Sequence, residues 1–216
     1  MQAQASASPP SELLVKNLSS MQNVESVRLT FVSEKKLQVL DKPFISGGVI
    51  IIARPDQVRF QTDWPYRSCY ILHAGKVFSR NQTDAQWRSA DLDRAQAIQT
   101  ILDQFASWAL DKTGDIAGDY TVTMARSQLE SQPASAAGRP TAAVQPAIVD
   151  LFTLIPRDPV VAKAVTQIEL GFSLQTHQLI FIAIVSADGD QSSFWFDQID
   201  VNPHLTATCF EPAGPA

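Results

Sequence analysis

Three histidines are the side chains of this chain that could exchange protons near neutral pH. His73, His177 and His204 each stand at or beside a predicted turn. None is spaced with a nucleophile and an acid as in a catalytic triad, and the GxSxG, P-loop, GxGxxG and HExxH motifs are absent. The sequence therefore predicts solvated turn histidines, no catalytic residue, no cofactor and no enzymatic activity.

Two aspartates and two cysteines could in principle bind metal. Asp188 and Asp190 flank a glycine, but the other alternating ligands of a calcium loop are missing, so a hairpin turn is expected. Cys69 and Cys209 have no CxxC spacing and no nearby histidine, so no metal site is expected. Two alternatives stay open for the cysteines: two buried free thiols, or one long-range disulfide in an oxidising compartment.

Composition and charge exclude several classes of protein. The 216 residues are 45% hydrophobic and 18% charged, which is enough to bury a sizeable core. A net charge of −5 argues against binding a nucleic-acid backbone. No apolar run approaches the roughly 18 residues of a membrane-spanning helix. The chain is expected to be a monomer with no nucleic-acid partner.

The N-terminus has two interpretations. Residues 1–8 are small and polar, with the A-x-A spacing found near signal-peptide cleavage sites, but without the charged and apolar parts of a signal. On one interpretation the chain is a mature exported protein whose signal peptide has been removed and which carries an added Met1. The alternative is an ordinary disordered N-terminus. In either case residues 1–8 are expected to be disordered.

The elements that would position any site are mostly strands. Phe44 to Phe78 predicts three or four consecutive strands joined by tight turns, with Val58, Phe60 and Thr62 alternating with polar residues. A strand is expected before this meander, at Val27–Lys36. Others are expected at 119–125 and 148–155, and three more form hairpins between 165 and 200.

Two amphipathic helices are expected, at Glu12–Met21 and Ala95–Leu110, because their apolar residues recur at helical spacing. Residues 127–146 are poor in large apolar residues and predict a mobile loop. Phe210 is expected to anchor an irregular tail, of which 213–216 form the end. Residues 9–212 are therefore expected to form a single domain.

About ten antiparallel strands and two helices predict a mainly β (α+β) fold, an incomplete β-barrel or half-barrel whose helices cap an apolar cavity. The strands carry more apolar surface than two helical stripes can cover at native packing density. The alternative is that the helices fill the interior completely. The side chains expected to line the cavity are Ile50, Ile52, Val58, Phe60, Tyr70, Leu72, Ile98, Leu102, Phe105, Phe172, Ile182, Phe194 and Phe196.

Several short motifs follow one another in order between Val27 and Pro212. They are Gly47-Gly48 before an apolar strand, Ala53-Arg54-Pro55-Asp56, Val58-Arg59-Phe60, Trp64-Pro65, Ala74-Gly75-Lys76-Val77, Leu154-Ile155-Pro156-Arg157-Asp158, Asp188-Gly189-Asp190, the strand Phe194–Ile199 and Phe210-Glu211-Pro212. This order resembles the periplasmic outer-membrane lipoprotein carrier family, LolA. The chain departs from the family at Ala74, where an aspartate is usual, and in its longer loop, so it resembles a divergent member.

The resemblance implies a carrier that takes acyl chains of a lipid or lipoprotein into an apolar cavity and shuttles them across the periplasm toward the outer membrane. It implies an inner-membrane donor complex and an outer-membrane acceptor as partners. It also implies that Arg54 acts as a latch by hydrogen bonding backbone groups of the helical lid. A non-carrier sensor or scaffold on the same fold is the alternative. An enzyme acting on a lipid is disfavoured because no histidine is placed with a nucleophile.

Overall fold

The computed structural model describes residues 8–19, 23–84, 86–89, 116–129, 133 and 147–212 of the chain. Its elements, in chain order, are α1 (Pro10–Ser19), β1 (Ser26–Lys36), β2 (Phe44–Ala53), β3 (Gln57–Trp64), β4 (Ser68–His73), β5 (Lys76–Asn81), β6 (Arg88–Ser89), α3 (Ile116–Asp119), β7 (Tyr120–Gln128), β8 (Ile148–Pro156), α4 (Pro159–Ala162), β9 (Val165–Ser173), β10 (Leu179–Ser186), β11 (Gln191–Val201) and the 3₁₀ turn η1 (Ala207–Phe210).

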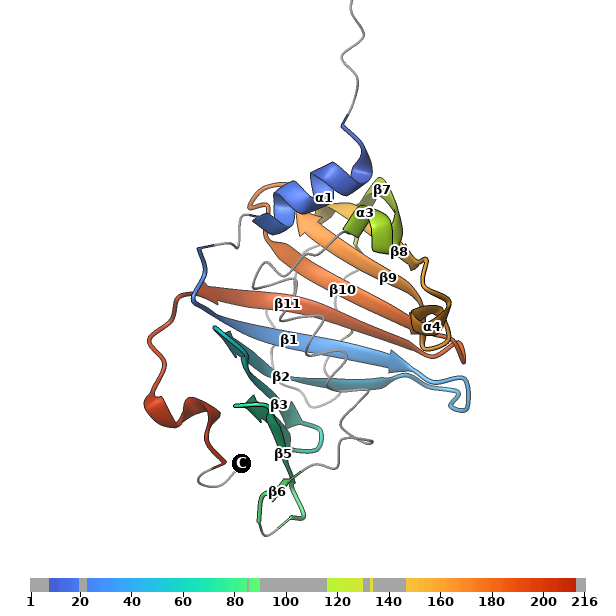
Figure 1. Cartoon of the computed structure of the whole chain (residues 1–216). Coiled ribbons are helices and arrows are strands. Elements are labelled where there is room, and N and C mark those ends of the chain that lie inside the picture. The colour runs from blue at the N-terminus through green and yellow to red at the C-terminus, as the bar shows by residue number, and fades with distance from the viewer. Residues whose placement is uncertain are drawn as a thin grey trace, which may run out of the picture.

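All the described strands belong to one antiparallel sheet of 11 strands (Figure 1). The order is β6-β5-β4-β3-β2-β1-β11-β10-β9-β8-β7, so the sheet has two edges and does not close. The predicted incomplete barrel is confirmed.

One pairing distant in sequence joins the two halves of the sheet. Strand β1 pairs with β2 on one side and with β11 on the other, while every other neighbouring pair of strands is consecutive in sequence. Asn202, just after β11, secures this seam. Its side-chain oxygen accepts hydrogen bonds from the amides of Glu25, at 2.8 Å, and Ser26, at 3.1 Å.

Strand alternation gives the sheet two apolar faces. We call the face that carries Ile50, Ile52 and Val58 the inner face, and it holds the main core cluster. Helix α1 packs on this face through Leu14 and Leu18, both buried, and it lies across one end of the sheet in Figure 1. The apolar stripe predicted for this helix is therefore the surface that it buries.

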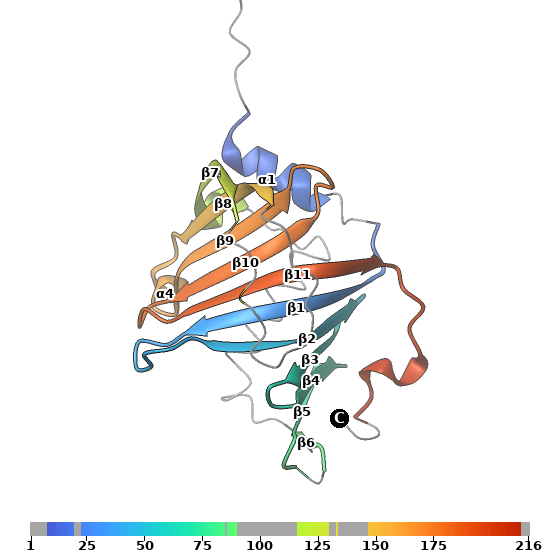
Figure 2. The same ribbon diagram turned by 180° about the vertical axis from the view of Figure 1, so that it is seen from behind.

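The outer face is covered partly by the C-terminal segment. Phe210 of η1 packs with Cys69 and Ile71 of β4 in a second cluster, and Figure 2 shows this red segment beside the strands β2 to β5. The guanidinium Nη1 of Arg59 donates to the carbonyl of Cys209 at 3.0 Å. The predicted anchoring role of Phe210 is confirmed, since its side chain is only 5% exposed.

The glycine pair Gly47-Gly48 allows β2 and β3 to approach closely. The register between these strands shifts at this point. A Cβ atom on Gly48 would overlap the carbonyl oxygen of Gln61, and one on Gly47 would overlap the Trp64 ring. Both positions thus require glycine for space rather than for a left-handed backbone.

The described helices and loops differ from the prediction in their bounds. Helix α1 begins at Pro10, two residues before the predicted start, and residues 20–22 lie outside the described chain. Strand β7 runs through Gln128, into the segment expected to be a loop, because it pairs with β8 up to Ile148. The predicted helix Ala95–Leu110 lies outside the described residues, as does most of the predicted loop.

We expect Gly48→Ala to lower the free energy of unfolding by about 3 kcal/mol or more, at the upper end of the range for overpacking, because the clashing atom belongs to the backbone. Gly75→Ala is the control. Gly75 has φ +70°, and a Cβ added to it would meet nothing within 4 Å, so only local strain of roughly 1 kcal/mol is expected. Urea unfolding measures both. Equal losses in the two variants would contradict the close approach.

Candidate functional site

The inner face brings together most of the residues predicted to line a cavity. Phe60 is half-buried and packs against this cluster, and Tyr70 lies opposite it in the register of β3 and β4. Ile98, Leu102 and Phe105 lie outside the described residues. The predicted residues that are buried in the cluster are Ile50, Ile52, Val58, Leu72, Phe172, Ile182, Phe194 and Phe196.

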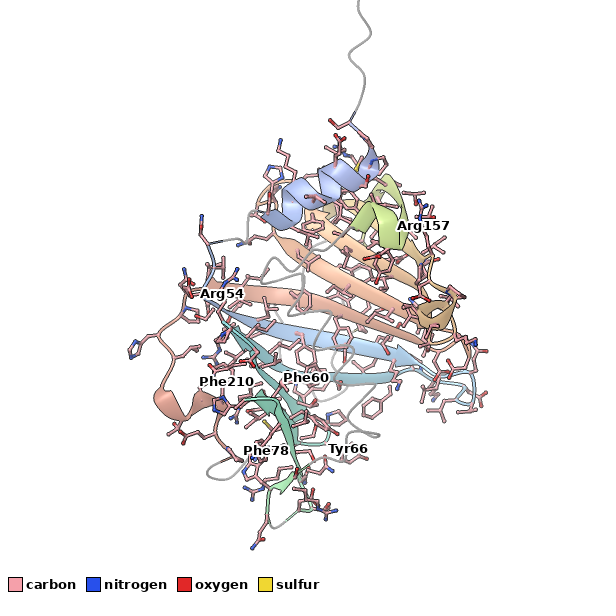
Figure 3. All side chains as sticks on the ribbon, in the orientation of Figure 1. Arg54, Phe60, Tyr66, Phe78, Arg157 and Phe210 are labelled. Atoms are coloured by element: carbon pink, nitrogen blue, oxygen red, sulfur yellow. The ribbon has the colours of Figure 1, made fainter. Side chains whose placement is uncertain are left out.

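Three aromatic rings form the centre of the inner face, where the two halves of the sheet meet. Phe60 of β3, labelled in Figure 3, stacks on Phe31 of β1 with ring centroids 5.1 Å apart. Phe194 of β11 meets Phe31 edge-on at 5.8 Å and Phe60 at 6.4 Å. Phe194 comes from a strand that is distant in sequence from the other two, so the β1–β11 pairing completes the group.

The inner face also contains residues that were not predicted as site residues. Phe152 of β8 packs edge-on against Phe172 at 5.7 Å and is fully buried. The alternation within the predicted strands 27–36, 148–155 and 165–173 was the available signal for most of the others, while Leu170 was expected among the apolar strand residues around the cavity. The additional buried members of the cluster are Leu14, Leu18, Val24, Val27, Leu29, Phe31, Val77, Ile116, Phe152, Leu154 and Ile168.

A buried pair of hydroxyl groups lies on this face. The oxygens of Ser33 on β1 and Ser46 on β2 lie 2.7 Å apart. The two side chains satisfy one another, so they can be buried without an unpaired donor. Strand alternation from Phe152 also places the ion pair of Arg126 and Asp150, 3.3 Å apart, on the inner face near the β7 edge.

Arg54 lies at the end of β2 and bonds the segment that connects α1 to β1. Its Nε donates to the carbonyl oxygen of Val24 at 2.9 Å, and its backbone amide donates to the carbonyl of Glu25 at 2.9 Å. Figure 3 shows Arg54 at the strand ends beside this connection. Its predicted role as a latch stays a prediction, and the contact seen is with the connection that carries the helix.

The two cysteines lie together on the outer face, away from the inner cluster. Both are free thiols in the structure and both belong to the cluster around Phe210. Burial raises the pKa of Cys69 to about 11, although the positive charge of Arg59 opposes the shift. Burial also raises the pKa of Cys209. The disulfide between them stays a prediction.

The histidines are dispersed in the structure. The Nδ1 of His73 lies 2.7 Å from the side-chain nitrogen of Gln57, while His177 and His204 are exposed. Within the described part of the chain, no three His, Cys, Asp or Glu side chains group as metal ligands would. Among the same residues, no helix has the length and apolar character needed to cross a membrane.

Comparison with known proteins gives a likeness of fold. No protein-family model and no curated protein matches the chain. An uncharacterized conserved protein from Thermus thermophilus matches at 6% identity with a TM-score of 0.51, over 94% of this chain and 93% of that chain. This match shows that the fold occurs in a solved structure.

Two further solved structures match less closely. Lipoprotein LppX of Mycobacterium tuberculosis matches at 8% identity and a TM-score of 0.49, over 90% of this chain and 98% of that chain. The LolA superfamily protein NE2245 of Nitrosomonas europaea matches at 8% identity and a TM-score of 0.42, over 94% and 98%. Each of these likenesses is one of fold alone.

We expect Arg54→Leu to loosen α1, because the side-chain bond to the α1–β1 connection is lost. Hydrogen exchange of residues 10–19 should become at least about tenfold faster, because a hydrogen bond to a charged group contributes about 1.5–3 kcal/mol to the free energy of a local opening. Gln57→Leu, at the start of the next strand, is the control. Unchanged exchange in Arg54→Leu would contradict the latch.

The Cys69 thiol should make stability fall at high pH. Its pKa in the folded chain, about 11, lies above the ordinary value of 9.0, so the unfolded chain loses the proton first. The stabilisation is complete below pH 9 and is lost toward pH 11, by up to about 2–3 kcal/mol. Urea unfolding of Cys69→Ala should show a smaller decline than the unsubstituted protein.

Alkylation of the protein without reductant, followed by measurement of its intact mass, tests the predicted disulfide between Cys69 and Cys209. Two labelled thiols would exclude this disulfide.

Proposed function

We propose that this protein is a carrier that binds the acyl chains of a lipid or lipoprotein against the inner face of its half-barrel. The observation that carries the proposal is one apolar cluster extending over the inner face from β5 to β8, with half-buried residues of β7 packed on it. Polar groups on the same face include the paired hydroxyls of Ser33 and Ser46 and the ion pair of Arg126 and Asp150.

The physical basis is the transfer of hydrocarbon out of water. Burying about ten methylene groups at about 0.8 kcal/mol each would contribute about 8 kcal/mol, which corresponds to micromolar affinity. Such contacts have little directionality, so a surface of this kind accepts chains of different length. Release then requires a partner or a movement of the covering helices.

Half-buried apolar side chains mark where an acyl chain would make contact. They belong to the same cluster but are not fully covered, and they come from both halves of the sheet. Phe60 is the central one, and its ring contacts those of Phe31 and Phe194. The others are Leu13, Tyr120, Val122, Val165, Leu179, Ile184 and Ile199.

The proposed setting follows from the resemblance to the lipoprotein carriers. The protein would act in the periplasm after export, receive its cargo from an inner-membrane donor complex and deliver it to an outer-membrane acceptor. It would act as a monomer and catalyse no covalent step. Transport toward the outer membrane is thus the proposed role.

A second candidate is a sensor or scaffold whose interior is filled by its own side chains. It is supported by full burial of several inner-face residues, including Ile52, Phe152 and Ile182 at 0% exposure. Native mass spectrometry of protein purified from its own host separates the two functions. A carrier should retain lipid, whereas a filled scaffold should give the mass of the chain alone.

We expect a fluorescent fatty acid to bind at about micromolar concentration and Phe60→Arg to weaken this binding at least about tenfold, because a charge would enter the acyl contact surface. Val201→Arg is the matched control, since Val201 is an exposed apolar strand residue outside the cluster. Circular dichroism checks that both variants fold. Failure of the unsubstituted protein to bind the probe, with no lipid in the native mass spectrum, would reject the carrier and favour the scaffold.

A further inference from the structure

We propose that one end of the sheet docks against an anionic lipid bilayer. The surface consists of Val39, Leu40, Phe44, Tyr66, Val160 and Val161, and we call it the turn-end surface. These residues come from the β1–β2 hairpin, the β3–β4 turn and α4, where the strands β1, β3 and β8 finish. Figures 1 and 2 both place α4 and the β1–β2 hairpin on the same side of the sheet.

The first observation is a concentration of exposed apolar side chains. The described chain has eleven exposed large apolar residues, and six of them form this surface. Val39 is 87% exposed and lies at the tip of the hairpin, while Val160 is 72% and Tyr66 69% exposed. Single exposed apolar residues need no explanation, but a gathering of them marks a surface that binds an apolar partner.

The second observation is that hydrogen bonds and stacking join the turns into one surface. The backbone amide of Gln38 donates to Asp190 at 2.9 Å, and its side chain donates to the carbonyl of Gly189 at 3.0 Å. These bonds fasten the β1–β2 hairpin to the β10–β11 turn. The amide of Ala187, in that turn, donates to the carbonyl of Ala164, just after α4, at 3.1 Å.

Phe44 and Tyr66 extend the same surface along β2 and β3. Their rings stack nearly parallel, with centroids 6.4 Å apart and planes within 4° of each other. Both rings are exposed in spite of this contact. An exposed tyrosine with an apolar body and a polar hydroxyl suits the boundary between lipid headgroups and acyl chains.

The third observation is charge, which selects the partner. Four of the seven lysines, Lys35, Lys36, Lys42 and Lys163, lie at this end and are exposed. The turns of this end, residues 34–43, 65–67, 157–164 and 187–191, together with Asp119, whose carbonyl accepts from the amide of Arg157, carry six basic and six acidic side chains and so no net charge. Since the whole chain carries −5, the rest of the molecule carries all of the net negative charge.

Two aspartates at this end accept hydrogen bonds within the turns, whereas two of its lysines form no ion pair among the described residues. Asp158 accepts from the amide of Val160 at 2.7 Å, and Asp190 accepts from Gln38, so these carboxylates hold the turns. Lys36 pairs with Glu34 at 2.9 Å. Lys42 and Lys163 form no ion pair within the part of the chain that the structure describes.

Exposed apolar side chains with lysines at the same end of the sheet are suited to binding a bilayer that contains acidic lipids. The apolar side chains enter the headgroup region, and the lysines extend to the phosphates. A protein of net negative charge would approach with this end first, because repulsion turns the remainder away. The docking does not depend on the proposed carrier function, although it would bring the inner face to a lipid source.

Sedimentation of the full chain with vesicles tests the proposal. We expect binding to vesicles of equal parts phosphatidylcholine and phosphatidylglycerol. Val39→Ser combined with Leu40→Ser should weaken binding at least about tenfold, since two aliphatic contacts are lost without a change of charge. Val201→Ser, at the other end of the strands, is the matched control and should bind as the unsubstituted protein does.

A second pair of variants tests the charge. Lys42→Gln combined with Lys163→Gln should weaken binding to the mixed vesicles several-fold but leave the weaker binding to pure phosphatidylcholine unchanged, and added salt should have the same effect. The proposal is overturned if the protein binds neither vesicle, if the serine variant binds as tightly as the control, or if only a protein partner is bound.

The outcome is independent of the carrier test. The serine variant should keep its affinity for the fluorescent fatty acid, because Val39 and Leu40 lie outside the inner cluster. Vesicle binding without fatty-acid binding would support docking and reject the carrier. Fatty-acid binding without vesicle binding would reject the docking proposal and leave the carrier proposal unaffected.

Discussion

The structure depends on one constraint: a single sheet must keep two apolar faces out of water. Ile50, Ile51 and Ile52 show it within three residues, because the first and third lie in the inner cluster and the second packs on the outer one. A two-layer protein normally buries one face of its sheet. Here α1 covers part of one face and the C-terminal segment part of the other, so the chain ends contribute to the core.

The curvature of the sheet follows from local irregularities in its ladders. The register shifts between Leu29 and Phe31, between Gly47 and Gly48, and between Leu179 and Phe181. Such shifts bend a strand and increase its twist. Because they lie in the middle strands rather than at the edges, they fold the sheet around the aromatic group of Phe31, Phe60 and Phe194. The shape and the site thus have a common origin.

Period-two alternation predicted the inner face well, because a strand residue that is buried fixes the direction of its second neighbours. It predicted that Ile50, Ile52 and Val58 share one surface, and the three side chains do lie in one cluster. It could not predict contacts that depend on which strands become neighbours across the β1–β11 seam, such as Phe31 with Phe194. The bond from Arg59 to the carbonyl of Cys209 joins residues 150 apart, and no local pattern encodes it.

The position of β1 has a consequence for synthesis of the chain. Of the described strands it is the first to be synthesised, yet one of its two edges pairs only with β11, which is the last of them. The hairpin with β2 can form early, since it is local. Until β11 arrives, the nascent chain displays an open edge of eleven residues from Ser26 to Lys36, rich in valine, leucine and phenylalanine. Such an edge pairs readily with other chains, so biosynthesis, rather than the finished fold, is the stage at which this architecture is most exposed to aggregation.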